Sequence, residues 1–235
     1  MDVRTFIEEM ELLAPPDLAE DFDVGRIGLI VEGSPDIRNV CCALDATPGV
    51  VKQAVGLGAD MLIVHHTPIW TPLTAMTGSM ADLMREVLSA RLNIYVMHTN
   101  FDRAEEGVND ALAEVLMLSN VSPLSLGRIG TCTLTLPEIS RLLGGNIRIW
   151  GSLAAPKRLA LVAGSGFDPL IMQEAKRAGA DAFLSAEMKH STARSAPLPC
   201  IEATHYSLEA PAMKRLALRR GWQYLDDPPV LLTIP

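Results

Sequence analysis

The sequence predicts an α/β fold in which short buried strands alternate with amphipathic helices. Apolar runs of four to six residues recur along the chain, and segments with helical start and stop signals separate them. The clearest unit runs from the strand at Val40 through a helix opened by Pro48 to the strand Met61–His66. These observations favour β-α-β units and a largely parallel sheet.

Composition restricts the classes of function. The chain has 235 residues, of which 49% are hydrophobic, so it can bury one large or two small cores. Its net charge of −8 argues against nucleic acid as a main partner, because phosphate binding needs clustered basic residues. The one basic cluster has helical spacing and is interpreted as a solvated helix face: Lys214, Arg215, Arg219 and Arg220.

The cysteines and the N-terminus indicate the compartment. None of the four cysteines forms a C-x-x-C pair, and Cys41 and Cys42 lie in an apolar run, so reduced core thiols are expected. No apolar run approaches the roughly 20 residues needed to span a bilayer, and residues 1–13 resemble an acidic amphipathic helix. We therefore expect a cytoplasmic protein with no membrane partner.

In the first half of the chain, periodicity and turn residues define the following elements. Pro15-Pro16 ends a first helix, Gly58 caps a second, and Leu83, Met84, Val87 and Leu88 should face inward from a third. Residues 119–128 carry turn chemistry that could link to a second lobe. The expected helices are 3–13, 48–57, 80–92 and 107–118, and the expected strands are 26–32, 40–44, 61–66 and 93–97.

The second half repeats the first at a fixed offset. Gly179-Ala180-Asp181 matches Gly58-Ala59-Asp60 after 121 residues, and Pro169 opens a helix as Pro48 does. We expect two related lobes, although shared capping rules could produce the same short match. Strands are expected at 159–164, 183–184 and 199–204, then a helix with Pro211 in its first turn and Leu216 and Leu218 on it, and an edge strand at Val230–Ile234.

All five histidines follow predicted apolar strands. They stand at positions 65, 66, 98, 190 and 205, each with a carboxylate or another histidine nearby. Histidines buried in a core would scatter among the helices, and surface histidines would be indifferent to strand ends. The ends of strands are also where open α/β sheets place ligands, so the pattern predicts a site.

The donor types point to metal ions. Imidazoles and carboxylates without thiolate suit Zn, Mn, Fe, Co or Ni better than a structural zinc centre. If His65, His66, Asp102, His205 and Glu209 are all ligands, five side chains exceed one open tetrahedral zinc. They suit two divalent ions that share a carboxylate.

The pattern resembles the Nif-three-like (Ngg-interacting factor three-like) proteins, some of which are called type 2 GTP cyclohydrolase I. The resemblance covers nearly the whole chain and rests on four stretches. These are Gly58-Ala59-Asp60 leading into His65-His66, His98-Thr99-Asn100-Phe101-Asp102, Lys189-His190, and His205-Tyr206-Ser207-Leu208-Glu209.

The resemblance implies a metal-ligand set and an architecture. The family's two metals would be held by His65, His66, Asp102, His205 and Glu209. The implied fold is two interlocked α/β lobes with mixed sheets and the dinuclear site in the cleft between them. The first lobe, 1–125 plus 205–235, would carry most ligands, and 126–204 would form the second. Homo-oligomers, including hexameric rings, are the implied assembly.

Departures from the family pattern affect the substrate pocket. Ala186-Glu187 and Glu202-Ala203-Thr204 replace stretches that often contain glycine, and Thr67 stands where proline is common. The ligands survive these changes, but the contour of the pocket is altered.

Other residues near the ligands are assigned competing roles. Glu187 and His190 are candidates for general acid or base, or for groups that hold ligands and water. His98 and Asn100 could orient Asp102, and Asp45 could line the site or cap the helix that begins at Pro48.

The leading hypothesis is a dinuclear metal-dependent hydrolase. A metal-bound hydroxide would attack a small-molecule substrate, such as a nucleotide or another phosphate-bearing metabolite. The alternative is a non-catalytic metal carrier, insertase or regulator that uses the same ligands. A third hypothesis, ring opening of GTP, rests on the resemblance alone.

Overall fold

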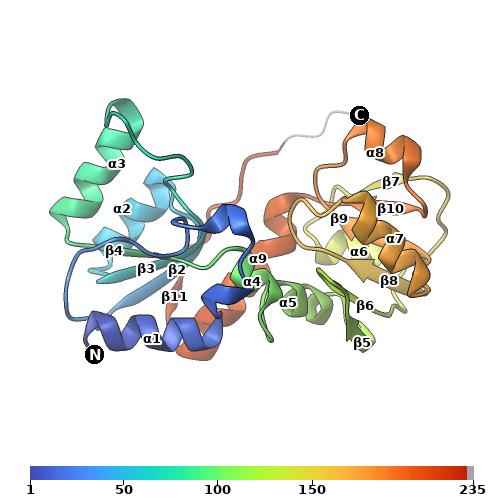
Figure 1. Ribbon diagram of the computed structural model, residues 1–235, viewed down its shortest axis with the longest axis horizontal. Helices are drawn as coiled ribbons and strands as arrows, with labels where there is room; N and C mark the ends of the chain where they lie inside the picture. The colour runs from blue at the N-terminus through green and yellow to red at the C-terminus, as the bar shows by residue number, and fades with distance from the viewer. Residues whose placement is uncertain (232–235) are drawn as a thin grey trace. The chain divides into compact units, whose positions relative to one another are not determined.

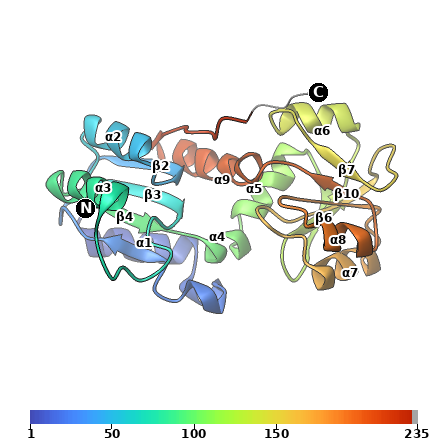
Figure 2. The same cartoon turned by 90° about the horizontal axis from the view of Figure 1, so that it is seen from above.

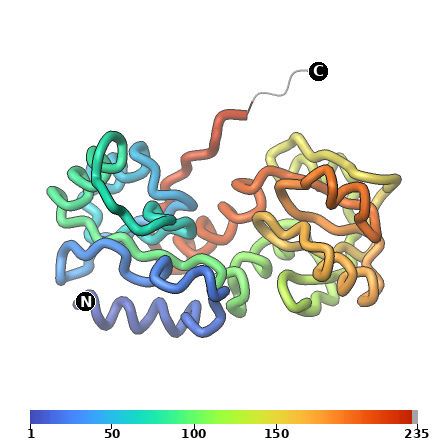
Figure 3. The backbone as a smooth tube through the Cα atoms, turned by 45° about the horizontal axis from the view of Figure 1, so that its top comes forward, coloured from blue at the N-terminus to red at the C-terminus, as the bar shows by residue number. Residues whose placement is uncertain are grey.

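The computed structural model describes residues 1–231, and the chain divides into two compact units. The first contains Met1–Glu105 and Met213–Pro228, and the second contains Glu106–Ala212 and residues 229–231. Helix α9 (His205–Arg220) contributes its first half to the second unit and its second half to the first. Figure 3 follows these two crossings, in green near residue 105 and in red along α9. The sequence prediction places the boundaries of the two lobes at 125/126 and 204/205.

The first unit is built on a five-stranded sheet with the order β1-β4-β3-β2-β11. Four strands run parallel, and β1 pairs antiparallel with β4 at one edge. The strands are β1 (Gly28–Val31), β2 (Val40–Asp45), β3 (Met61–His66), β4 (Asn93–Val96) and β11 (Gln223–Tyr224). The helices are α1 (Val3–Leu13), α2 (Pro48–Gly56), α3 (Gly78–Ser89), α4 (Thr99–Arg103) and the 3-10 turns η1 (Pro16–Leu18) and η2 (Asp21–Asp23).

Helices α2 and α3 cover one face of this sheet, and α1 lies on the other (Figures 1 and 2). Alternate strand residues such as Leu62 and Val64 pack against Val51 and Val87 from the two helices in one buried cluster. The expected inward face of the third helix is confirmed for Leu83, Met84 and Val87. It is wrong for Leu88, which is 53% exposed at the helix's outer side.

The second unit has a six-stranded sheet with the order β5-β6-β8-β9-β10-β7. Strands β8, β9 and β10 are parallel, and the flanking pairs are antiparallel. The strands are β5 (Ser119–Pro123), β6 (Arg128–Thr131), β7 (Arg148–Trp150), β8 (Arg158–Leu161), β9 (Ala182–Ser185) and β10 (Cys200–Glu202). The other helices are α5 (Val108–Val115), α6 (Leu136–Leu142), α7 (Pro169–Arg177) and α8 (His190–Ser195).

The two units share a topology, which confirms that the lobes are related. The order β1-β4-β3-β2 in the first unit corresponds to β7-β10-β9-β8 in the second, with the antiparallel strand at the same edge. Gly58 and Gly179 follow the corresponding helices with φ of 65° and 88°, values that favour glycine. Asp60 and Asp181 each accept hydrogen bonds from two backbone N–H groups at the start of the neighbouring strand.

Three expectations about elements are wrong. Residues 119–128 are not only a turn, because β5 pairs there with β6. Pro211 lies inside α9 rather than in its first turn. The edge strand is β11, while residues 230 and 231 are not in a strand and 232–234 lie outside the described residues.

Among the described residues, no helix is both long and apolar enough to cross a membrane.

The thiols of all four cysteines are free and buried, as expected. Burial raises the pKa of each thiol, and that of Cys200 to about 12.

We expect stability to decrease at alkaline pH through these thiols. The folded state retains protons that the unfolded chain loses above the ordinary thiol pKa of 9.0, so unfolding becomes more favourable as pH rises from there toward 12. The urea midpoint measured from pH 8 upward checks this sign. Cys200→Ala should flatten the decline, and an unchanged pH slope in that variant would contradict the assignment.

Candidate metal centre

His65 and His66 end β3, where alternation along the strand sends the two side chains in different directions. His65 is fully buried, and its Nδ1 donates to the carbonyl oxygen of Met97 at 2.7 Å. A carbonyl only accepts hydrogen bonds, so this contact places the ring proton on Nδ1 and the lone pair on Nε2.

His66 is oriented by a carboxylate from the neighbouring strand. Its Nδ1 donates to Oδ1 of Asp45 at 2.7 Å, and the two residues are directly paired between β2 and β3. Of the two roles considered for Asp45, the cap of α2 belongs to Thr47, whose Oγ1 accepts from the Val50 N–H at 3.1 Å. Asp45 therefore orients the His66 ring.

His98 has a partner that the sequence did not reveal. Nδ1 of His98 lies 2.9 Å and 3.0 Å from the two carboxylate oxygens of Asp23, which is fully buried in η2. Asp23 also accepts from the Thr99 N–H at 3.1 Å and from the Thr99 hydroxyl. One carboxylate thus orients the ring and caps the start of α4.

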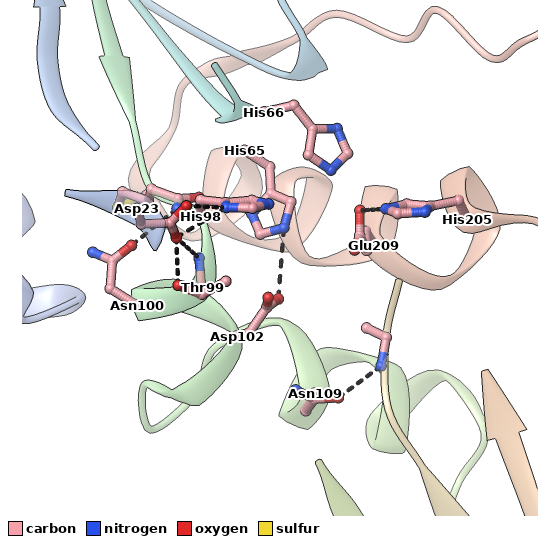
Figure 4. A network of polar contacts seen from close by, with 12 residues as sticks. Asp23, His65, His66, His98, Thr99, Asn100, Asp102, Asn109, His205 and Glu209 are labelled. Carbon is pink, nitrogen blue, oxygen red and sulfur yellow. Dashed lines mark hydrogen bonds and ion pairs between the residues drawn. The ribbon is translucent and has the colours of Figure 1, made fainter. Parts of the chain in front are cut away.

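The three imidazoles form one cluster in the first unit (Figure 4). One ligand nitrogen from each of His65, His66 and His98 lies within 4.8 Å of the others, and their ring centroids are 4.9 to 5.6 Å apart. All three rings come from the carboxyl ends of β3 and β4. The prediction that histidines gather at strand ends is met within this unit.

Asp102 joins this cluster from α4. Its Oδ1 lies 3.5 Å from Nε2 of His65, and its side chain is 13% exposed. Asn100, expected to orient Asp102, instead fixes the backbone. Its Oδ1 accepts from the His98 N–H at 2.9 Å, and its Nδ2 donates to the carbonyl of Ala14 at 2.7 Å.

The second unit contributes two predicted ligands from the first turns of α9. His205 and Glu209 are four residues apart, and Nε2 of His205 lies 2.9 Å from Oε2 of the buried Glu209. The helix begins here because Oγ1 of Thr204 accepts from the Ser207 N–H at 3.2 Å. The His-x-x-x-Glu spacing fits a shared helical face, although the sequence prediction placed both residues before the helix.

Glu187 orients His205. Its Oε1 accepts from Nδ1 of His205 at 2.8 Å, and its backbone adopts a φ of 63°, which is unusual for a residue with a side chain. His190, the other predicted acid or base, is exposed at the first residue of α8. The structure therefore gives Glu187 a ligand-holding contact.

Buried Glu202 fixes the loop that carries Glu187. Its carboxylate accepts from the Met188 N–H at 3.0 Å, from Nη2 of Arg148 at 2.6 Å and from Nε1 of Trp150 at 2.7 Å. Sequence reasoning had treated this position only as a departure from the family pattern.

We expect Glu202→Gln to weaken metal binding about tenfold and to destabilise the protein by about 1 to 3 kcal/mol. The amide nitrogen of glutamine carries two donor hydrogens, whereas every partner of Glu202 is itself an N–H donor. The loop that carries Glu187 therefore loses hydrogen bonds, and Glu187 holds the His205 ring less firmly. Chelator competition and the 15N resonance of His205 Nδ1 measure the effect. Glu138→Gln is the matched control, because Glu138 is only partly buried and accepts from the Thr135 N–H in the same unit. Equal effects in both variants would contradict the assignment.

Gly164 makes room for the carboxylate of Glu209. A Cβ at this position would lie 2.2 Å from Oε1 of Glu209 and 3.3 Å from Nε2 of His205. Ser185 holds the loop in place, because its hydroxyl donates to the Gly164 carbonyl at 2.8 Å and accepts from the Gly166 N–H at 2.7 Å. The sequence signal for this close approach is Gly164-Ser165-Gly166, which follows an apolar strand.

A sequence model described as Duf34/NIF3 (NGG1p interacting factor 3) matches residues 1–221. The chain belongs to this family. The resemblance inferred from the histidine motifs is thereby confirmed.

The relatives of this NIF3-family chain match it over most of its length. A protein from Streptomyces coelicolor named GTP cyclohydrolase 1 type 2 homolog is 32% identical, over 92% of this chain and 87% of that protein. A protein of the same name from Methanocaldococcus jannaschii is 31% identical, over 92% and 93%. The solved structure of reduced HcgD from Methanocaldococcus jannaschii has a TM-score of 0.80 and 28% identity, covering 95% and 96% of the two chains.

The donor set of this NIF3-family chain fits divalent transition metals. The predicted ligands are imidazole nitrogens and carboxylate oxygens, and the four thiols lie in the buried cores instead. Three predicted ligands, His65, His66 and Asp102, belong to the first unit, and His205 and Glu209 belong to the second. The buried histidine and glutamate groups can hold metal ions.

Proposed function

We propose that this chain is a dinuclear metal-dependent hydrolase that acts on a small, phosphate-bearing substrate. The ligands assigned to the two ions are His65, His66, Asp102, His205 and Glu209. One observation carries the metal assignment: His65, His66, His98 and His205 each have Nδ1 engaged by a protein acceptor. This arrangement assigns metal ligation to Nε2 and is typical of metal-binding histidines.

Each histidine ring has its own hydrogen-bond acceptor at Nδ1. Met97 contributes a backbone carbonyl, whereas Asp45, Asp23 and Glu187 contribute carboxylates that raise the basicity of the rings they hold. A pair of bound divalent ions lowers the pKa of coordinated water and stabilises the attacking and leaving oxygens of the substrate. Glu187 is assigned a positioning role at His205, and His190 stays the candidate for proton transfer.

Metal analysis tests the proposal. Protein purified without chelator should contain about two divalent ions per chain by mass spectrometry. Asp102→Ala should lose at least one ion, whereas Asp82→Ala, which removes an exposed carboxylate paired with Arg85, should keep both. Metal near zero, with no uptake on addition, would refute the site.

Turnover assays separate the candidate reactions. Metal-loaded protein is screened against phosphomonoesters, cyclic nucleotides and GTP, with formate release followed for GTP. Release of phosphate, or cleavage of a phosphoester bond, that disappears in Asp102→Ala supports the hydrolase hypothesis. Formate release would identify ring opening of GTP, the activity suggested by the names of the relatives. Bound metal without turnover on any substrate would support the carrier or regulator hypothesis instead.

A further inference from the structure

Two exposed aromatic side chains lie beside the histidine cluster of the first unit. Phe22 of η2 is 51% exposed and Trp70 is 49% exposed, and their ring centroids are 6.2 Å apart. Single exposed apolar residues are ordinary, but two aromatic rings in contact form a continuous apolar surface in water. We call Phe22, Arg26 and Trp70 the ring-binding surface.

Arg26 supplies a cation to this surface. Its guanidinium carbon lies 4.8 Å from the centroid of the Trp70 ring, and its Nε donates to the Trp70 carbonyl at 2.7 Å. Within the described residues, Nη1 and Nη2 of Arg26 make no hydrogen bond. The fork of an arginine held in this way is suited to a phosphate or carboxylate group.

The ring-binding surface is continuous with the metal-binding histidines through His98. The Trp70 ring meets the His98 ring edge-on with a centroid distance of 5.6 Å, and Phe22 meets it at 6.3 Å. His98 lies 5.1 Å and 5.6 Å from His65 and His66 by the same measure. A ligand ring on Trp70 would therefore be one side chain away from the cluster.

Side-chain hydrogen bonds of Thr67 fix the turn that presents Trp70. Thr67 accepts from the Ile69 N–H at 3.2 Å and donates to the Ile69 carbonyl at 3.3 Å, which fixes the backbone next to Trp70. These local hydrogen bonds hold the backbone that carries the tryptophan in place.

We propose that the ring-binding surface recognises the planar heterocycle and an anionic group of a nucleotide substrate. Aromatic rings stack on bases irrespective of base identity, and Arg26 pairs with a phosphate oxygen. This inference rests on the proposed function, because it places the phosphate-bearing substrate next to the metal-binding histidines.

Binding of nucleotides tests the inference. Metal-free and metal-loaded proteins are titrated by calorimetry with AMP, GMP, CMP and UMP, and with ribose 5-phosphate, which lacks the ring. We expect at least one nucleotide to bind about tenfold more tightly than ribose 5-phosphate. Trp70→Leu and Phe22→Ala should remove this difference, and Trp70→Phe should retain most of it. Arg26→Ala should weaken the binding of nucleotides and of ribose 5-phosphate to the same extent.

Matched variants control for general effects. Leu88→Ala removes another apolar side chain that is 53% exposed, and Arg220→Ala removes a guanidinium that lies 5.7 Å over Trp222. Both should bind nucleotides as the unsubstituted protein does, and thermal melts of every variant establish that it is folded.

Two results would overturn the inference. The first is equal affinity for nucleotides and ribose 5-phosphate, or no binding of either. The second is unchanged nucleotide binding in Trp70→Leu; if that variant also forms a smaller oligomer, the surface contacts a second copy of the chain instead. Two bound ions without a ring preference would refute this inference alone. A ring preference in protein that takes up no metal would refute only the proposed function.

Discussion

Gly164→Ala is expected to weaken metal binding by about 10- to 100-fold while the chain stays folded. The added methyl group would overlap Oε1 of Glu209, at a separation of 2.2 Å. That oxygen is the end of a side chain, so it can move away without a large change in the backbone. The substitution therefore weakens metal binding by the proposed ligand Glu209, which is buried beside His205 and has little space in which to remain aligned with it.

Gly179→Ala provides the matched control for this substitution. Gly164 and Gly179 have φ values of 67° and 88°, so an alanine at either position costs about 1 to 2 kcal/mol of stability. At Gly179 the nearest side-chain atoms to an added Cβ are those of Arg158, at 3.8 Å, so only the backbone cost applies. Zinc affinity from chelator competition, with urea midpoints, separates the two effects. Equal zinc affinity in both variants would remove Glu209 from the ligand set.

Asp23→Ala is expected to destabilise the protein by about 3 kcal/mol. The substitution leaves Nδ1 of His98, the Thr99 N–H and the Thr99 hydroxyl without the buried carboxylate that accepts their hydrogen bonds. The first turn of α4 loses its cap, and that helix carries Asp102. We therefore expect weaker metal binding together with the lower urea midpoint.

Asp21→Ala is the control for this prediction, since Asp21 is exposed in the same 3-10 turn and its removal should change stability by less than about 0.5 kcal/mol. Urea unfolding followed by circular dichroism compares the two variants. If Asp23→Ala were no less stable than Asp21→Ala, the buried carboxylate would not support α4.

The sequence was sufficient for the strands that carry the histidines. Met61–Val64 and residues 94–97 are short apolar runs, and this is the pattern of strands buried on both faces, so β3 and β4 were located closely. Because parallel strands place their carboxyl ends at one edge, the approach of His65, His66 and His98 followed from this assignment. Pro48 and Pro169 likewise marked the first residues of α2 and α7.

Contacts between residues distant in sequence could not be found in the same way. Asp23 acts on His98 across 75 residues and lies in a polar turn that local patterns treat as surface. Strand β5 is exposed along its whole length, so it lacks the apolar alternation that marks a strand, and its pairing with β6 defines it. Both features depend on contacts between distant segments of the chain, which local sequence patterns do not reveal.

The start of α9 was misjudged for a local reason. Proline is common in the first turn of a helix, so Pro211 suggested that the helix begins just before it. The structure begins α9 at His205, where Thr204 supplies the cap, and the helix continues through Pro211. His205 and Glu209 consequently share one helical face instead of lying on a loop.

The engaged Nδ1 atoms have a consequence for the order in which folding and metal binding occur. Each ring held by Met97, Asp45, Asp23 or Glu187 has already lost its rotational freedom when the chain folds. An arriving ion therefore does not have to supply the free energy for ordering those rings, and the large apolar cores supply the stability of the fold. In this respect the protein is the opposite of a zinc finger, whose chain is unfolded until the metal binds.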